Sequence, residues 1–292
     1  MNVSKLASLC FTSLVPLAVA TTLLGACSEN ETPPPTHGAY DGGATAALPC
    51  VPNLDGKIDS NELQPQIGIA ATYLVSPAGK TRQVDLAGVT NSSGKLVWNF
   101  AVDYADDGAV KVAAQPLEGK WFASSFPGLV GAVVVPLDAA DTTESVYTID
   151  EHGFYLHGVA STKEGTPDQT IYVYDKPITV YQFPLAPGAS WKSTASVTGG
   201  TFRGLPFASK DTYEVSVDGA GQMELPDYTL TQALRVRTKV TIEPAAGQAT
   251  STRQVSFLFE CLGEVARATS NLNEPEENFT TASELRRLGM SN

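Results

Sequence analysis

The chain has 292 residues and a formal net charge of −12, and 42% of its residues are hydrophobic. Such an acidic balance excludes nucleic acid and anionic membrane surfaces as partners attracted by charge. The length is enough for one large domain or two small ones with a real core. Charged residues are sparse while Thr, Ser, Val, Gly and Pro are abundant, which is typical of extracytoplasmic β proteins.

The first 27 residues have the layout of a secretory signal peptide. Lys5 supplies a positive start, residues 6–24 are almost all apolar or small, and Gly25-Ala26 stands directly before Cys27. The alternative is a transmembrane helix, because about 20 apolar residues can span a bilayer. Six Ser, Thr and Pro residues dilute this run, however, and no basic stop-transfer cluster follows it. We therefore predict that residues 1–26 are a cleaved signal peptide.

The end of this segment, Leu24-Gly25-Ala26-Cys27, resembles the lipobox of bacterial lipoproteins. The resemblance implies a diacylglycerol on the Cys27 thiol, cleavage before Cys27, and acylation of the new amine with a fatty acid such as palmitate. Several acyl chains would hold the protein on a membrane, since each buried CH₂ contributes about 0.8 kcal/mol. Ser28 rather than Asp follows the cysteine, and this resembles the sorting pattern for the outer membrane. The expected location is the cell envelope, facing the periplasm.

Residues 27–49 are predicted to form a flexible tether. Pro33-Pro34-Pro35 and several glycines lie among polar and small residues, with no apolar periodicity. Such a segment cannot bury enough surface to order itself. Its expected role is to hold the folded part away from the membrane.

Two cysteines remain once Cys10 leaves with the signal peptide and Cys27 carries lipid. Cys50 and Cys261 would then share an oxidising compartment, and a disulfide between them is the predicted state. It would close a loop of about 210 residues and contribute roughly 5 kcal/mol in the chain-entropy model. The alternatives are two buried thiols or a metal site, but neither cysteine has a His or Cys nearby at ligand spacing.

Residues 50–66 contain a short segment that resembles the second part of an EF-hand calcium loop. The resemblance implies calcium ligands at the positions of Asn53, Asp55, Lys57 (through its carbonyl), Asp59 and Glu62. Val51 stands where the first carboxylate belongs, and Pro65 shortens the helix that should follow. The alternative is a turn at Asp55-Gly56 followed by a capping box. Calcium is the only cofactor that the sequence suggests.

Residues 67–292 are predicted to be one β domain. Short segments rich in apolar and β-branched residues alternate with Gly, Pro, Asn and Asp turns. They cover residues 67–75, 95–102, 110–114, 129–135, 145–149, 153–159, 170–174, 178–183, 190–197, 211–217, 230–242, 252–261 and 264–269. Arg235, Arg237 and Lys239 alternate with mostly apolar neighbours, which predicts a half-exposed antiparallel strand. The expected fold is all-β, a mainly antiparallel β-sandwich or curved half-barrel. One or two short helices are expected, at residues 282–288 and 117–122.

Catalytic signals are weak. His152 and His157 are the only histidines of the β domain, and their odd spacing in an extended segment points them to opposite faces. Neither an HExxH nor a GxSxG sequence occurs. No catalytic residue is therefore assigned, and a non-enzymatic role is favoured.

Aromatic residues lie on or beside the predicted strands. They fill a core in one interpretation and line an apolar cavity inside a curved sheet in the other. The candidate lining residues in the second interpretation are Trp98, Trp121, Tyr172, Tyr174, Tyr181 and Trp191.

Residues 170–265 resemble uncharacterised envelope proteins of Gram-negative bacteria. The similar stretches are Tyr174-Asp175-x-Pro177-Ile178-x-Val180 with Phe183-Pro184-Leu185, Gly188 and Trp191, then Val217-Asp218-Gly219-x-Gly221-x-Met223-x-Leu225-Pro226 with Leu234-Arg235-Val236. The family's Gly-Thr-Phe corner is Asp227-Tyr228-Thr229 here. The resemblance implies a β-rich periplasmic domain. It implies no established activity, so no functional residue is carried over.

Two functions follow as hypotheses. The first is a non-catalytic, lipid-anchored envelope lipoprotein that binds an apolar small molecule or a partner protein through a curved β surface. The second is a structural or accessory envelope protein without a small ligand. A hydrolase is a third, less favoured hypothesis.

Overall fold

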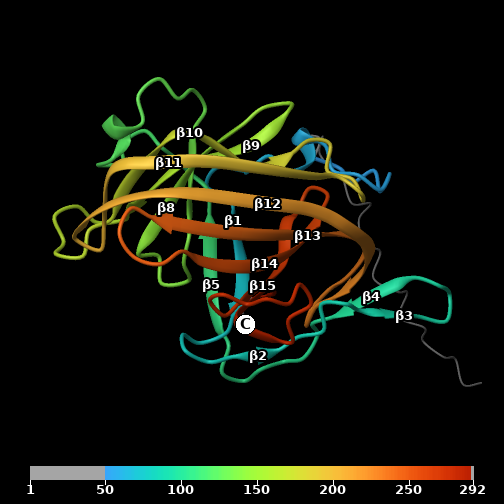
Figure 1. Ribbon diagram of the computed structural model, residues 1–292. Helices are drawn as coiled ribbons and strands as arrows, with labels where there is room; N and C mark the ends of the chain where they lie inside the picture. The colour runs from blue at the N-terminus through green and yellow to red at the C-terminus, as the bar shows by residue number, and fades with distance from the viewer. Residues whose placement is uncertain (1–49, 291–292) are drawn as a thin grey trace, which may run out of the picture. The chain divides into compact units, whose positions relative to one another are not determined.

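The computed structural model describes residues 50–290, and its strands belong to one sixteen-stranded sheet (Figure 1). The described part contains two short 3-10 helices, η1 (Ser60–Glu62) and η2 (Ala123–Ser125). The fold is therefore all-β, as predicted. The strands are β1 (Ala70–Val75), β2 (Arg82–Gln83), β3 (Val89–Thr90), β4 (Leu96–Asn99), β5 (Gly108–Ala113), β6 (Gln115–Pro116), β7 (Val133–Pro136), β8 (Thr143–Ile149), β9 (Gly153–Ser161), β10 (Ile171–Gln182), β11 (Ser190–Phe202), β12 (Leu205–Glu224), β13 (Thr229–Pro244), β14 (Thr250–Phe259), β15 (Gly263–Ser270) and β16 (Thr281–Leu288).

The order of the strands shows that the sheet curls back on itself. The main path runs β5-β1-β16-β15-β14-β13-β12-β11-β10-β9-β8-β7-β6, so its two end strands, β5 and β6, are neighbours in the chain. Figure 1 shows β1 and β5 crossing behind the long strands β11 to β14. Of the two predicted architectures, the curved one is correct: the sheet is a nearly closed barrel, not a sandwich of two sheets.

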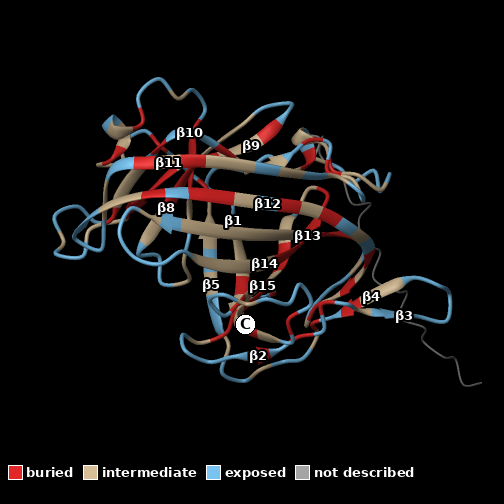
Figure 2. Ribbon diagram, in the orientation of Figure 1, coloured by how far each residue is buried: buried red, intermediate tan, exposed pale blue. Residues whose placement is uncertain are grey.

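Strand β13 shows how sequence alternation sets the two faces of this sheet. Leu234 and Val236 are buried on one face, while Arg237 and Lys239 are half-buried on the other. Figure 2 shows buried and intermediate stretches along the long strands. The predicted half-exposed strand is confirmed at Arg237 and Lys239, whereas Arg235 is buried because the carbonyl of Leu86 in the loop before β3 lies over it. Successive side chains of a strand point to opposite faces, so the residues paired with Leu234 and Val236 on neighbouring strands share their face.

That shared face is the concave one, because it brings together strands that are far apart in the sheet. One inner cluster joins Val236 of β13 with Ile149 of β8 and Tyr181 of β10. A second inner cluster joins residues of β9 to β12, including Tyr174 and Tyr213. We call the surface that these inward side chains form the concave face.

The convex face of strands β12 to β16 is covered by residues 84–104. Trp98 of β4 is fully buried there against Phe257, with ring centroids 4.9 Å apart. Strand β4 runs parallel to the end of β12 and approaches it closely at Gly221, where a Cβ atom would lie 2.5 Å from the carbonyl oxygen of Leu96. Glycine is therefore required at this crossing.

Buried ion pairs hold this covering segment to the sheet. Arg287 of β16, fully buried, donates to the carbonyls of Phe100 and Val102 and to the carboxylate of Asp107 at 2.6 Å. Asp107 also accepts from Arg82 at 2.6 Å. A second outer cluster, built on Phe122 and Phe126, covers β7 to β9.

Neither segment that was predicted to be helical, residues 282–288 or residues 117–122, forms a helix. Residues 282–288 lie in β16, because they pair with β15 on one side and β1 on the other. Leu285 faces the convex cluster and Arg286 the concave face, as strand alternation requires. Residues 117–122 form turns, and the short helix η2 begins after them.

The N-terminal part of the described chain is fixed to the barrel by a disulfide. Cys50 and Cys261 are bonded, as predicted, with Cα atoms 5.6 Å apart. The carboxylate of Glu260 accepts the backbone N–H groups of Asn53 and Leu54, both at 2.7 Å. The predicted signal peptide, the predicted lipidation site Cys27 and the predicted tether lie outside the described residues. Within residues 50–290, no helix is both long and apolar enough to cross a membrane.

Candidate functional site

The concave face carries a row of tyrosines. Tyr147 of β8 stacks on Phe154 at 4.6 Å, and Phe154 faces Tyr181 of β10 at 6.0 Å. Burial raises the pKa of Tyr181, and the charges of Glu264 and Arg267 on β15 also act on it. Because four strands separate β10 from β15 in the sheet, this interaction crosses the interior.

A buried carboxyl group lies among the tyrosines at one end. Tyr174 donates a 2.7 Å hydrogen bond to Oδ2 of Asp211, whose residue is 2% exposed. Burial raises the pKa of Asp211, and the hydrogen bond from Tyr174 only partly opposes this. Oδ1 of Asp211 has no hydrogen-bond partner among the described residues. Tyr172 packs on Tyr174 with ring centroids 5.7 Å apart.

Tyr172 also marks an opening of the concave face. A groove of about 480 Å³ lies between residues 137–143, 162–170 and 202–203, and Tyr172 and Val159 form part of its lining. Phe202, at the tip of the β11–β12 hairpin, is 42% exposed beside this groove. We call this groove the mouth. Through Tyr172 the mouth adjoins the tyrosine row.

The far part of the concave face is ionic. Arg267 of β15 and Arg286 of β16 are direct cross-strand partners. Glu264 and Glu284 lie beside them at 3.5–3.7 Å. Burial, with the neighbouring Arg267 charge, lowers the pKa of Arg286. The sequence analysis missed these residues. Glu264 and Arg267 are three residues apart, so regular alternation would place them on opposite faces, and they share a face only through the register shift between Phe257 and Leu258 of the partner strand.

The six predicted lining aromatics divide between the two faces. Tyr172, Tyr174, Tyr181 and Trp191 belong to the inner clusters. Trp98 lies in the convex cluster, and Trp121 in the outer cluster with Phe122. For those two residues the cavity interpretation is wrong, because each belongs to a segment that packs on the outside of the barrel.

The calcium-like segment forms the alternative structure considered above. Glu62 accepts from the side chain of Asn53 at 2.8 Å and from the backbone of Asp59 at 2.9 Å, which completes a capping box. The ammonium of Lys57 contacts the carboxylates of Asp55 and Asp59 at 3.4 and 2.5 Å. Among residues 50–290, no three His, Cys, Asp or Glu side chains are grouped to hold a metal ion.

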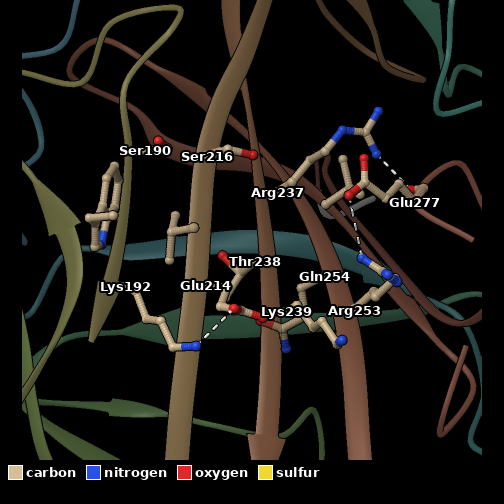
Figure 3. Close-up of a pocket in the computed structure, with 13 residues that line it drawn as sticks. Ser190, Lys192, Glu214, Ser216, Arg237, Thr238, Lys239, Arg253, Gln254 and Glu277 are labelled. Atoms are coloured by element: carbon tan, nitrogen blue, oxygen red, sulfur yellow. Dashed lines mark hydrogen bonds and ion pairs between the residues drawn. The ribbon is translucent and has the colours of Figure 1, made fainter. Parts of the chain in front are cut away.

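The outer face of β11 to β14 carries a second groove, of about 610 Å³ (Figure 3). Lys192 of β11 pairs with Glu214 of β12 at 3.1 Å, and Arg253 of β14 with Glu277 at 3.9 Å. Figure 3 shows Lys239 on the same side as this first pair. Alternating and mostly paired charges are typical of a solvated sheet surface, so we place the candidate site on the concave face.

The two histidines do not form a catalytic group. His152 is exposed beside Glu151, and a ring nitrogen of His157 lies 2.7 Å from the hydroxyl of Thr148. Burial alone lowers the pKa of His157, with no carboxylate contributing. A general base oriented by an acid is therefore not found at either residue.

No protein-family model, curated protein or solved structure matches this chain. The resemblance of residues 170–265 to Gram-negative envelope proteins stays a prediction.

Proposed function

We propose that the chain is a non-catalytic, lipid-anchored envelope lipoprotein that binds an amphipathic small molecule on its concave face. The observation that carries this proposal is the mouth. It opens beside Tyr172, at the end of a row of inward tyrosines within a nearly closed barrel. Small-molecule sites are usually concave, with apolar and aromatic walls and a few polar groups. Here the tyrosine row supplies the aromatic walls, and the lining of the mouth is mostly polar.

The envelope location is supported by two independent features. The lipobox-like sequence around Cys27 implies an acyl anchor, and the Cys50–Cys261 disulfide fits an oxidising compartment. The outer membrane is the proposed membrane because Ser28 follows the cysteine.

The ligand-binding proposal is tested with dodecanol, a neutral amphiphile, by calorimetry on the full chain. We expect saturable binding, and we expect Phe202→Ser to weaken it about fivefold, which corresponds to about 1 kcal/mol of lost apolar contact. Leu272→Ser is the matched control, because Leu272 is also an exposed apolar residue but does not line the mouth. Equal losses in both variants would contradict a site at the mouth.

The anchor is tested by growing cells with labelled palmitate. The label is expected on the wild-type chain and absent from Cys27→Ser, since the thiol carries the diacylglycerol. Mass spectrometry of the wild-type N-terminal peptide is expected to begin at an acylated Cys27. A peptide beginning elsewhere, or one without lipid, would overturn the lipoprotein assignment.

A further inference from the structure

Two arginines face each other on the concave face. Arg267 and Arg286 are Cα partners in the β15–β16 pair, so their side chains leave the sheet side by side. Like charges directly opposite each other destabilise a sheet. Their presence within the barrel therefore needs a compensating interaction.

The neighbouring glutamates supply only part of that compensation. Arg267 lies 3.7 Å from both Glu264 and Glu284, and Arg286 lies 3.5 Å from Glu284. Charge-assisted hydrogen bonds are shorter, about 2.7–2.9 Å. Nε of each arginine has no partner among the described residues, although the Arg286 side chain is only 7% exposed. Buried donors without partners are costly, so a hydrogen-bond acceptor is missing at this point.

The missing acceptor is better supplied by a ligand oxyanion than by the glutamates themselves. Glu264 is already engaged, because it accepts the Ser256 hydroxyl at 2.7 Å. Glu284 is shared between the two arginines, because it is a partner of both. A planar carboxylate can accept two parallel N–H···O hydrogen bonds from one guanidinium group.

An aromatic path connects this pair with the mouth. Tyr147 and Tyr172 belong to one inner cluster, and Tyr172 lines the mouth. Tyr181 packs in the other inner cluster with Val236, whose partner on β14 is Ser256, and Ser256 is in turn the partner of Arg267. The ring of Phe154 lies between those of Tyr147 and Tyr181. A hydrocarbon chain could therefore pack along the rings while its head group reaches the arginines.

We propose that Arg267 and Arg286 bind the carboxylate head group of an amphipathic ligand, a long-chain carboxylic acid. This assignment depends on the proposed function, since it names the chemical class of the molecule held on the concave face.

The first experiment compares three twelve-carbon probes on the full wild-type chain by calorimetry: dodecanoate, dodecanol and dodecyltrimethylammonium. Dodecanoate is expected to bind at least about tenfold more tightly than dodecanol, as a charge-assisted contact would give. Dodecanoate is also expected to protect Arg267 and Arg286, but not Arg253 of the outer face, from modification by phenylglyoxal, measured by peptide mass spectrometry.

The second experiment uses Arg267→Gln and Arg286→Gln, with Lys239→Gln as the control because Lys239 lies on the outer face. Each arginine variant is expected to bind dodecanol as the wild-type chain does but to lose the tighter binding of dodecanoate. The Lys239→Gln control is expected to keep the tighter binding of dodecanoate. Should a variant fail to fold, the protection measurement on the wild-type chain still decides the question.

The outcomes separate the two proposals. Equal binding of dodecanoate and dodecanol, or tightest binding of the cation, would overturn the carboxylate site and leave the proposed function standing. Absence of binding by all three probes would overturn the proposed function, and the carboxylate site with it.

Discussion

At the residue scale, Asp211 shows how a buried acid makes stability depend on pH. Its pKa is raised, mainly by burial, although Tyr174 donates a hydrogen bond to it. A raised pKa in the folded state means that folding favours the protonated acid. This contribution is fully present below the ordinary aspartate pKa of about 3.9 and is lost as the pH rises through the raised value.

Replacement of Asp211 by Asn removes this titration. We expect the melting temperature of Asp211→Asn, relative to the wild-type chain, to rise as the pH increases from about 4 towards neutrality. The measurement is thermal unfolding of both proteins across that range. Asp103→Asn, at an exposed position, serves as the control. Its melting temperature is expected to differ from that of the wild-type chain by the same amount at every pH. A relative melting temperature that falls with pH would show that Asp211 is stabilised as an anion.

At the scale of elements, Arg287 fixes the covering segment to the sheet. Its guanidinium satisfies two backbone carbonyls and Asp107. Loss of one member of a buried ion pair leaves the other uncompensated and costs about 3–5 kcal/mol. We therefore expect Arg287→Met to lower the free energy of unfolding by about that amount in urea titrations.

The same variant is expected to loosen residues 84–104, which would shift the fluorescence of Trp98 to longer wavelength. Lys111→Met changes an exposed residue of β5 and is expected to alter neither quantity. An Arg287→Met chain that unfolds at the wild-type urea concentration would refute the anchoring role.

Strand β16 also shows why part of the fold could not be predicted. Residues 282–288 contain Ala, Leu, Glu and Arg, which favour helices, and Ala282, Leu285 and Leu288 have helical spacing. The strand forms because β15 and β1 supply partners on both sides. By contrast, β13 was predictable, since its alternation of charged and apolar residues needs no knowledge of its neighbours.

The candidate site was less accessible to sequence reasoning than the fold. The pairing of Arg267 with Arg286 depends on the register between two strands, and register follows from turns and the buried face rather than from either segment alone. The tyrosines could be placed on strands but not on a face. In the sequence, Trp98 and Trp121 have the same apolar, strand-like surroundings as Tyr181. They differ from it because their segments pack on the outside of the barrel.

At the scale of the whole molecule, the disulfide joins the start of the described chain to the β14–β15 turn. In the chain-entropy model a bridge with a sequence separation of 211 stabilises the fold by roughly 5 kcal/mol. We expect the double variant Cys50→Ser, Cys261→Ser to lose up to that amount in urea unfolding. In the denatured, unreduced wild-type chain, a maleimide is expected to label neither cysteine. Labelling of both would show that the thiols are free.

The same bridge determines how the molecule would respond to mechanical load. A pulling force applied at the N-terminal end, for example through a membrane anchor, reaches the barrel at Cys50 and passes directly to Cys261. The residues between the two cysteines then carry no load. Only the chain after Cys261, which contains β15 and β16, is stretched. At about 3.5 Å per extended residue, the intact bridge prevents the extension of roughly 700 Å of chain between Cys50 and Cys261. The aromatic part of the concave face, on β8 to β12, would therefore keep its connectivity under tension that pulls Arg267 and Arg286 away with β15 and β16.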